Sequence, residues 1–165
     1  MWGRRRTFLA VMLLVLSASQ ATACEDYSSQ SSSGYSSPAA PLVKQLVSTS
    51  HNLVNGTISV SAGASYVQGF TVTSSMVEPR VVGSFRAAGG SGNDIKVLIM
   101  DPLNYENWAN GHSVKVNYTS GQITVANIDV ALPSGTYYLV YSNRFSTFSS
   151  KSINTKVDLV YKEYR

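Results

Sequence analysis

Four carboxylates in the middle of the chain are the residues best suited to binding a metal ion. Asp94, Asp101, Glu106 and Asp129 supply hard oxygen ligands, and Asn93 adds an amide oxygen beside the first of them. Loops at the ends of strands use such oxygens to hold Ca²⁺, although the spacing is not that of an EF-hand. We favour the alternative that these residues occupy solvated turns and one salt bridge, and we predict no metal site.

Residues typical of catalysis are scarce. The two histidines, His51 and His112, have no second His or Cys at a ligand spacing, which argues against a transition-metal centre. Residues 89–92 (GGSG) lack the last glycine of a nucleophile elbow, because Asn93 stands there, and are more typical of a turn before a strand. No phosphate loop or dinucleotide fingerprint occurs. We therefore expect neither an enzyme nor a bound cofactor.

Tyr105 and Trp108 are candidates for ligand binding. They lie with Asn104, Asn107 and Asn110 in one short stretch bounded by proline and glycine. Aromatic rings stack on the C–H faces of sugars and amides pair with their hydroxyl groups, so the stretch is typical of a sugar-binding surface. The alternative, which we favour, is that Trp108 plugs one end of the fold.

Length and composition indicate one domain with additional segments. The chain has 165 residues, of which 13% are charged and 44% are hydrophobic, which excludes a coiled coil and an acidic disordered chain. One cysteine excludes an intrachain disulfide framework. The 13 Lys and Arg exceed the 9 Asp and Glu, but three of them, residues 4–6, belong to the N-terminal segment described next. The remainder is close to neutral, so the charge gives no argument for nucleic-acid binding.

Residues 1–23 contain the charged, apolar and small-residue regions of a secretory signal peptide, in that order. Three arginines precede an apolar run from Phe8 to Leu16, and residues 21–23 (ATA) form the cleavage region. The run is too short to span about 30 Å of hydrocarbon as a stable anchor. We therefore predict an extracytoplasmic protein that loses this segment.

Cys24, the single cysteine, directly follows the cleavage region. Residues 21–24 (ATAC) resemble a bacterial lipobox, and this resemblance implies a cell-envelope lipoprotein that its lipidated Cys24 holds on a membrane surface. The alternative is ordinary cleavage, which leaves a free cysteine on a secreted or periplasmic protein. Residues 24–51 are rich in Ser and Pro, with seven serines between 28 and 37, so we predict a flexible linker.

Residues 52–165 have the pattern of an all-β domain. Apolar residues alternate with polar ones in short segments that turn signals separate, most clearly from Ile153 to Tyr161. The stretch from Ile95 to Met100 is apolar on both faces, which indicates a central strand. About eight such segments predict an antiparallel β-sandwich with a jelly-roll-like arrangement.

Some local predictions are more specific. We expect a strand over Val114–Tyr118, joined through a hairpin turn at Ser120-Gly121 to a second strand over Gln122–Val125. The alternation changes phase between residues 125 and 128, which suggests a bulge or bend. We expect Leu103–Asn110 to form a loop or a single helical turn.

Two blocks of the domain resemble the GOLD (Golgi dynamics) domain, the lumenal part of eukaryotic early-secretory cargo receptors. The first block, residues 89–102, resembles that family's paired glycines, Asp-led strand and Asp-Pro, here Gly89, Gly90, Asp94, Asp101 and Pro102. The second block, residues 135–161, resembles its glycine-led aromatic strand and the loop that follows, here Gly135, Tyr137, Ser142, Asn143, Phe145, Ser146 and Lys151. The resemblance implies a β-sandwich interaction module. It does not carry over vesicle trafficking, because the receptors' cysteine pair, coiled coil, membrane span and sorting tail have no counterpart here.

Physical roles follow for the second block. Asn143 stands where a strand ends, and we expect its amide to bind backbone groups of a loop. We expect Phe145 and Phe148 to fold back as a lid over the end of the sandwich, and Lys151 to reach a carbonyl or a carboxylate such as Asp101 or Asp94. These roles are structural, and we favour them over a binding role.

The sequence therefore predicts a non-catalytic, extracytoplasmic binding module, namely a lipid-anchored GOLD-like lipoprotein. Its partner would be a protein or glycan of the cell envelope, and the membrane would be reached through the lipid on Cys24. The alternative is a carbohydrate-binding jelly-roll domain that uses Tyr105 and Trp108.

Overall fold

The computed structural model describes residues 43–90 and 92–165. The predicted signal peptide, Cys24 and most of the predicted linker lie outside these residues. The part of the chain that the structure describes contains no helix of the length and hydrophobicity needed to cross a membrane.

Eight strands and one helix make up the described residues. In chain order they are β1 (Leu46–Val60), β2 (Ser65–Val72), β3 (Val77–Ala88), β4 (Ile95–Met100), α1 (Pro102–Ala109), β5 (Tyr118–Ile123), β6 (Val125–Ala131), β7 (Gly135–Ser142) and β8 (Lys151–Tyr164).

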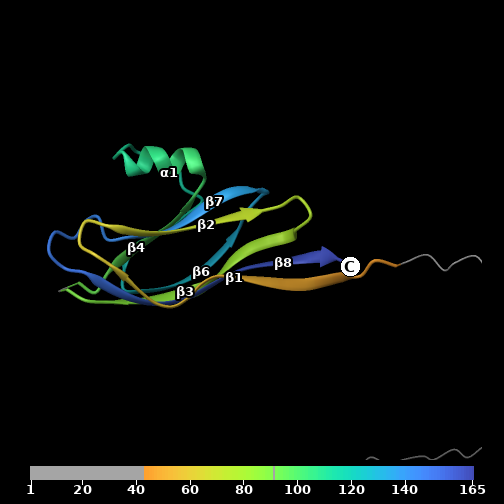
Figure 1. Cartoon of the computed structure of the whole chain (residues 1–165), viewed down its shortest axis with the longest axis horizontal. Coiled ribbons are helices and arrows are strands. Elements are labelled where there is room, and N and C mark those ends of the chain that lie inside the picture. Colours follow the sequence, from red (N-terminus) through yellow and green to blue (C-terminus); the bar gives the residue numbers. More distant parts are fainter. Residues whose placement is uncertain (1–42, 91) are drawn as a thin grey trace, which may run out of the picture. The chain divides into compact units, whose positions relative to one another are not determined.

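The strands form two four-stranded antiparallel sheets, with the orders β1-β8-β3-β6 and β2-β7-β4-β5 (Figure 1). The first, third, sixth and eighth strands thus build one sheet and the other four build the second, which is the connectivity of a jelly roll. The predicted all-β antiparallel sandwich with about eight strands is confirmed.

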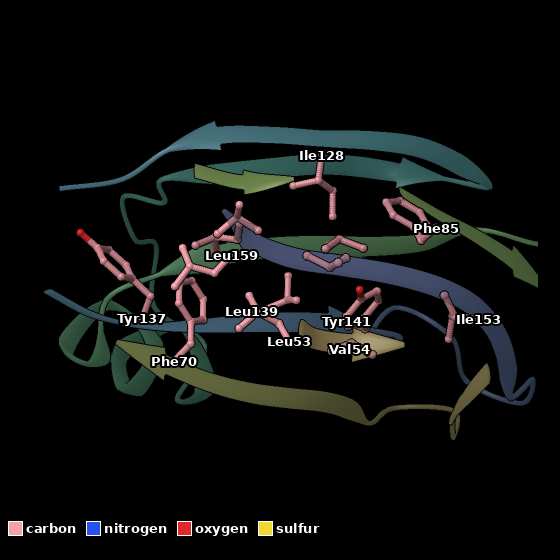
Figure 2. Packing of buried hydrophobic residues seen from close by; sticks show 14 of the residues in the cluster. Leu53, Val54, Phe70, Phe85, Ile128, Tyr137, Leu139, Tyr141, Ile153 and Leu159 are labelled. Atoms are coloured by element: carbon pink, nitrogen blue, oxygen red, sulfur yellow. The ribbon is translucent and has the colours of Figure 1, made fainter. Parts of the chain in front are cut away.

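The core lies between the two sheets. In β8 the side chains of Ile153, Val157 and Leu159 are buried and alternate with exposed or half-buried neighbours, as their period-two pattern predicts. They pack against aromatic residues from both sheets, such as Phe85 of β3 and Tyr141 of β7, whose rings meet edge to face at 6.3 Å (Figure 2). The two inner faces therefore form one continuous apolar layer.

The strand β4 is central, as its two apolar faces predict. It lies between β7 and β5, and five of its six residues are buried. Val97 and Ile99 face the core between the sheets, whereas Leu98 and Met100 belong to a second apolar cluster. Because side chains alternate along a strand, this second cluster covers the outer face of the β2-β7-β4-β5 sheet.

Gly83 in the middle of β3 allows two strands to approach each other closely. It pairs with Val157 of β8 and Ile128 of β6. A Cβ atom at Gly83 would lie 2.7 Å from the Cα of Val157, and still closer to the carbonyl oxygen of Lys156. A side chain therefore cannot fit at this position without moving β8.

Three local predictions are wrong. Ser120-Gly121 is not a hairpin turn, because β5 continues through it as a bulge in which two residues face Val97 of β4. The predicted strand over residues 114–118 contributes only Tyr118 to β5. The first strand begins at Leu46, inside the segment assigned to the linker.

The change of phase near residue 125 has a simple cause. The chain bends at Thr124, where it leaves β5 in one sheet and enters β6 in the other. The inward-facing set of positions must change at such a crossing, because each sheet has its own inner face. The predicted bend is thus present, one residue before the predicted span.

Candidate functional site

The region predicted as a loop or single turn forms the helix α1, which lies on the outer side of the second sheet (Figure 1). Asp101 caps its N-terminus. The Oδ1 atom of Asp101 accepts a hydrogen bond from the backbone N–H of Asn104 at 3.0 Å, and Oδ2 accepts one from the Asn104 side chain at 2.6 Å. These bonds, the backbone one first, hold the pKa of Asp101 below its usual value. Pro102 follows in the first turn, where its missing N–H costs nothing.

Packing against the sheet explains why this short segment is helical. Tyr105 and Trp108, one turn apart, contact the outer apolar cluster of Leu98, Met100 and Val140. The ring of Tyr105 lies 4.6 Å from that of Tyr138 of β7. Trp108 therefore covers the outer face of the sheet, and the prediction that it plugs the end of the sandwich is wrong.

A groove runs along both sides of Trp108. It consists of two neighbouring hollows that share Lys96, Trp108 and His112, and we name it the Trp108 groove. The hollow next to β7 has a volume of about 290 Å³, and its lining includes the polar residues Gln122 and Arg144. The other hollow, of about 300 Å³, extends along residues 113–116. Tyr105 lines neither hollow, so of the two predicted aromatic residues only Trp108 is in a position to contact a ligand there.

Arg144, which follows β7, completes one wall of the groove. Its guanidinium carbon lies 4.9 Å from the centre of the Trp108 ring, and its Nη1 donates a hydrogen bond to the Trp108 carbonyl oxygen at 3.0 Å. The first contact is a cation–π interaction and the second satisfies a carbonyl near the end of α1. Arg144 thus ties the loop after β7 to the helix, and it covers one face of the tryptophan ring.

Residues from the two blocks 89–102 and 135–161 meet at one end of the sandwich. Lys151, at the start of β8, is only 3% exposed, and its Nζ donates to the carbonyl oxygen of Gly89 at 2.8 Å and to Oδ1 of Asp94 at 3.2 Å. Gly90 lies beside them with a φ of 69°, and a Cβ there would lie 2.8 Å from the Cβ of Ser149. The predicted contact of Lys151 with a carbonyl and with Asp94 is confirmed, whereas Asp101 caps α1 instead.

Asn143 joins three segments at the same end. Its side chain is fully buried, and its Nδ2 donates to the carbonyl oxygens of Val60 at 3.2 Å, Ser61 at 3.1 Å and Ser149 at 2.8 Å. Its backbone N–H donates to Ala64. The prediction that Asn143 binds backbone groups of a loop is confirmed.

The loop that follows Asn143 has its own support. Ser146 donates from Oγ to the carbonyl oxygen of Ser149 at 2.9 Å and accepts from the Ser149 N–H at 3.2 Å. Phe145 is 39% exposed and lines the Trp108 groove. Phe148 is 94% exposed, so the predicted lid of two phenylalanines over the core is wrong.

Gly135 and Tyr137 lie at the opposite end of β7. Tyr137 donates from its hydroxyl to the carbonyl oxygen of Pro133 at 3.0 Å, and its ring stacks on Phe70 at 5.7 Å. Burial, aided by the charge of Asp101, raises the pKa of Tyr137. A Cβ at Gly135 would lie 3.3 Å from the Tyr137 hydroxyl oxygen. These residues therefore close the turn before β7.

Three of the four carboxylates considered as Ca²⁺ ligands have separate tasks, and the fourth, Glu106, is exposed on α1. Asp94 pairs with Lys151, Asp101 caps α1, and Asp129 forms an ion pair at 2.6 Å with Arg80. Among the described residues no three His, Cys, Asp or Glu side chains lie close enough to hold a metal ion.

The cationic wall of the Trp108 groove is the feature that the sequence did not reveal. Lys96 comes from β4 and Arg144 from the loop after β7, and they are far apart in the chain. The outward position of Lys96 in an otherwise apolar strand was the one local signal. Neither a protein family nor a curated protein sequence matches the chain.

Proposed function

We propose that the protein is a non-catalytic binding module of the cell envelope, built on a GOLD-like β-sandwich. The observation that carries the proposal is the Trp108 groove, which is open to solvent beside the loop between β7 and β8. Phe145 lines this groove and also the neighbouring hollow that contains Asp94 and Lys151. The buried contacts of Asn143 and Lys151 support the groove from behind, as a binding site on a rigid scaffold requires.

Attachment through Cys24 is the second part of the proposal. The signal-like residues 1–23 and the serine-rich stretch up to the domain support it, because a lipid on Cys24 would hold the domain near a membrane while the linker keeps it accessible. Metabolic labelling with an alkyne analogue of palmitate tests this part. We expect label on the wild-type protein and none on Cys24→Ser. Unlabelled wild type would contradict lipidation and leave the secreted or periplasmic alternative.

Carbohydrate binding is the second candidate function. The exposed polar groups of the groove, Gln122 and His112, suit the hydroxyl groups of a sugar. Arg144 covers one face of the Trp108 ring, so ring stacking would fall to the exposed Phe145 as well. The aromatic residues available to a sugar would thus be Trp108 and Phe145, instead of the predicted pair of Tyr105 and Trp108.

A capture experiment separates the candidates. The chain from residue 24, with Cys24→Ser, is immobilised and exposed to an envelope extract of the producing cells. Phe145→Ser serves as the groove variant, and Phe148→Ser, an equally simple change at a residue that lines neither hollow of the groove, serves as its matched control. A protein lost only with Phe145→Ser supports a protein-binding module, and a polysaccharide lost in the same way supports the second candidate. Captures equal in both variants, or none, would contradict binding at this groove.

A further inference from the structure

We propose that the Trp108 groove binds a saccharide that carries an anionic group, a carboxylate or a sulfate. The inference deepens the carbohydrate-binding form of the proposed function and rests on it. The groove contains two cationic side chains, Lys96 and Arg144, together with the amide of Gln122 and the imidazole of His112. The following observations concern its charge, its geometry and its polar lining.

The charge of the groove is one-sided. No Asp or Glu lines either hollow, and among the described residues neither Lys96 nor Arg144 forms an ion pair. One carboxylate, Asp94, is connected to the groove through a hydrogen bond from Gln122 at 3.4 Å. Asp94 lines the neighbouring hollow, where it forms an ion pair with Lys151. The two cations therefore keep their attraction for an anion from solution.

Arg144 is oriented before any ligand arrives. The Trp108 ring and carbonyl hold the guanidinium in place, and they occupy only one of its five N–H donors in a hydrogen bond. The remaining planar donors match the two oxygens of a carboxylate or sulfate, and a side chain that is already fixed loses little entropy on binding. Lys96 adds a second charge from the floor of the groove, on β4.

The rest of the lining favours a sugar over an acidic peptide. The exposed side chains of Gln122 and His112 line the hollow next to β7 together with the cations, and Phe145 supplies an exposed aromatic ring. Dense hydroxyl groups of a saccharide pair with such side chains, whereas a peptide gains most of its affinity from deep apolar pockets or from backbone pairing. An acidic saccharide satisfies both the cations and the neutral polar groups.

Direct titration tests the proposal. The chain from residue 24, with Cys24→Ser, is titrated by calorimetry with an oligogalacturonate, a sulfated glycosaminoglycan fragment, a neutral oligoglucoside and a poly-glutamate peptide. We expect binding of the oligogalacturonate or the sulfated fragment that weakens with added salt, and at least 10-fold weaker binding of the neutral sugar. Binding of the oligogalacturonate would identify the anionic group as a carboxylate, and binding of the sulfated fragment would identify it as a sulfate.

Charge-removing variants locate the site. Lys96→Gln and Arg144→Gln should each lower the affinity for the anionic saccharide by about 10- to 100-fold, because each removes charge-assisted hydrogen bonds, which are stronger than neutral ones. Lys156→Gln and Arg86→Gln, which make the same changes at residues that line neither hollow, should leave the affinity within about 2-fold. Arg144→Lys keeps the charge but not the planar donors, so its affinity should lie between those of the wild type and Arg144→Gln. Thermal unfolding of each variant separates loss of affinity from loss of folding.

Several outcomes would overturn the proposal. Equal affinity for the neutral and anionic sugars would contradict recognition of the anionic group. An equal loss of affinity in the control variants would show that the saccharide does not bind at this groove. Binding of poly-glutamate without either anionic sugar would replace the saccharide by an acidic protein. In that case, or where an envelope protein is lost only with Phe145→Ser, the binding module stands and only this inference fails.

Discussion

Replacing the buried loop residue Asn143 by alanine should strongly destabilise the domain. The Asn143 amide reaches the carbonyl oxygens of Val60, Ser61 and Ser149 from a fully buried position. Alanine would leave these carbonyls without their side-chain donor and would open a small cavity among them. The backbone bonds of residue 143 would remain, so the perturbation is confined to the side chain.

The magnitude follows from the contacts. An amide nitrogen has two hydrogens, so three carbonyls share two donors, and each net hydrogen bond contributes roughly 0.5–1.5 kcal/mol. With the cost of carbonyls left unpaired in the interior, we expect Asn143→Ala to lower the free energy of unfolding by about 2–4 kcal/mol. In a domain of this size that corresponds to a fall in Tm of about 10 °C.

Thermal and urea unfolding, followed by circular dichroism, measure the effect, with Asn154→Ala as the control. Asn154 is an exposed residue of β8, and its replacement should change the free energy by no more than about 0.5 kcal/mol. Asn143→Asp should be at least as harmful as alanine near neutral pH, because a carboxylate would face three carbonyl oxygens, and less harmful once acid protonates it. Equal midpoints for Asn143→Ala and Asn154→Ala would refute the reasoning. A fully stable Asn143→Asp at neutral pH would contradict the stabilising role assigned to the Nδ2 hydrogen bonds.

Three further predictions concern the strands and the helix. Gly83→Ala should cost about 2–3 kcal/mol in urea unfolding, or prevent folding, because its Cβ would collide with the neighbouring backbone, whereas Ser84→Ala should be nearly neutral. Burial raises the pKa of Tyr141 to about 12, so its contribution to stability is complete below about pH 10 and is lost as the pH rises toward 12; Tyr141→Phe should flatten the stability profile there. Because hydrogen bonds lower the pKa of Asp101, its cap stabilises the fold above about pH 4, and this stability is lost as the pH falls through the lowered pKa. Asp101→Ala should lower the free energy of unfolding by about 1 kcal/mol. The fluorescence of Trp108, the single tryptophan of residues 24–165, follows unfolding in both the pH series and the variant.

The strands that sequence alone predicts well are those whose burial is decided by alternation. The inward set of β8 and the two apolar faces of β4 are visible in the pattern because every second side chain meets the same environment. Ser120-Gly121 shows the limit of local signals. A turn dipeptide and a bulge both place a glycine at positive φ, here 67° at Gly121, and only the partner strand decides between them.

The helix α1 was missed because its own residues favour it only weakly. Two asparagines, a tyrosine and a tryptophan are poor helix formers, although Asp101 and Pro102 gave a start signal. The contacts of Tyr105 and Trp108 with the outer face of the sheet supply the missing stability. That face could not be foreseen as a whole, because its strand residues come from β2, β4 and β7 and are brought together only by the jelly-roll order.

Three consecutive residues link the end of β7 to the Trp108 groove. Asn143 is anchored inward, Arg144 turns outward onto Trp108, and Phe145 lines the groove. Because the backbone of residue 143 is fixed by Ala64 and its side chain by Val60, the direction in which Arg144 leaves the sheet is fixed too. The buried amide therefore does more than close the end of the sandwich. A change at Asn143 that leaves the domain folded should still weaken any ligand that depends on the position of Arg144, since the guanidinium would lose the preorganisation that its anchor provides.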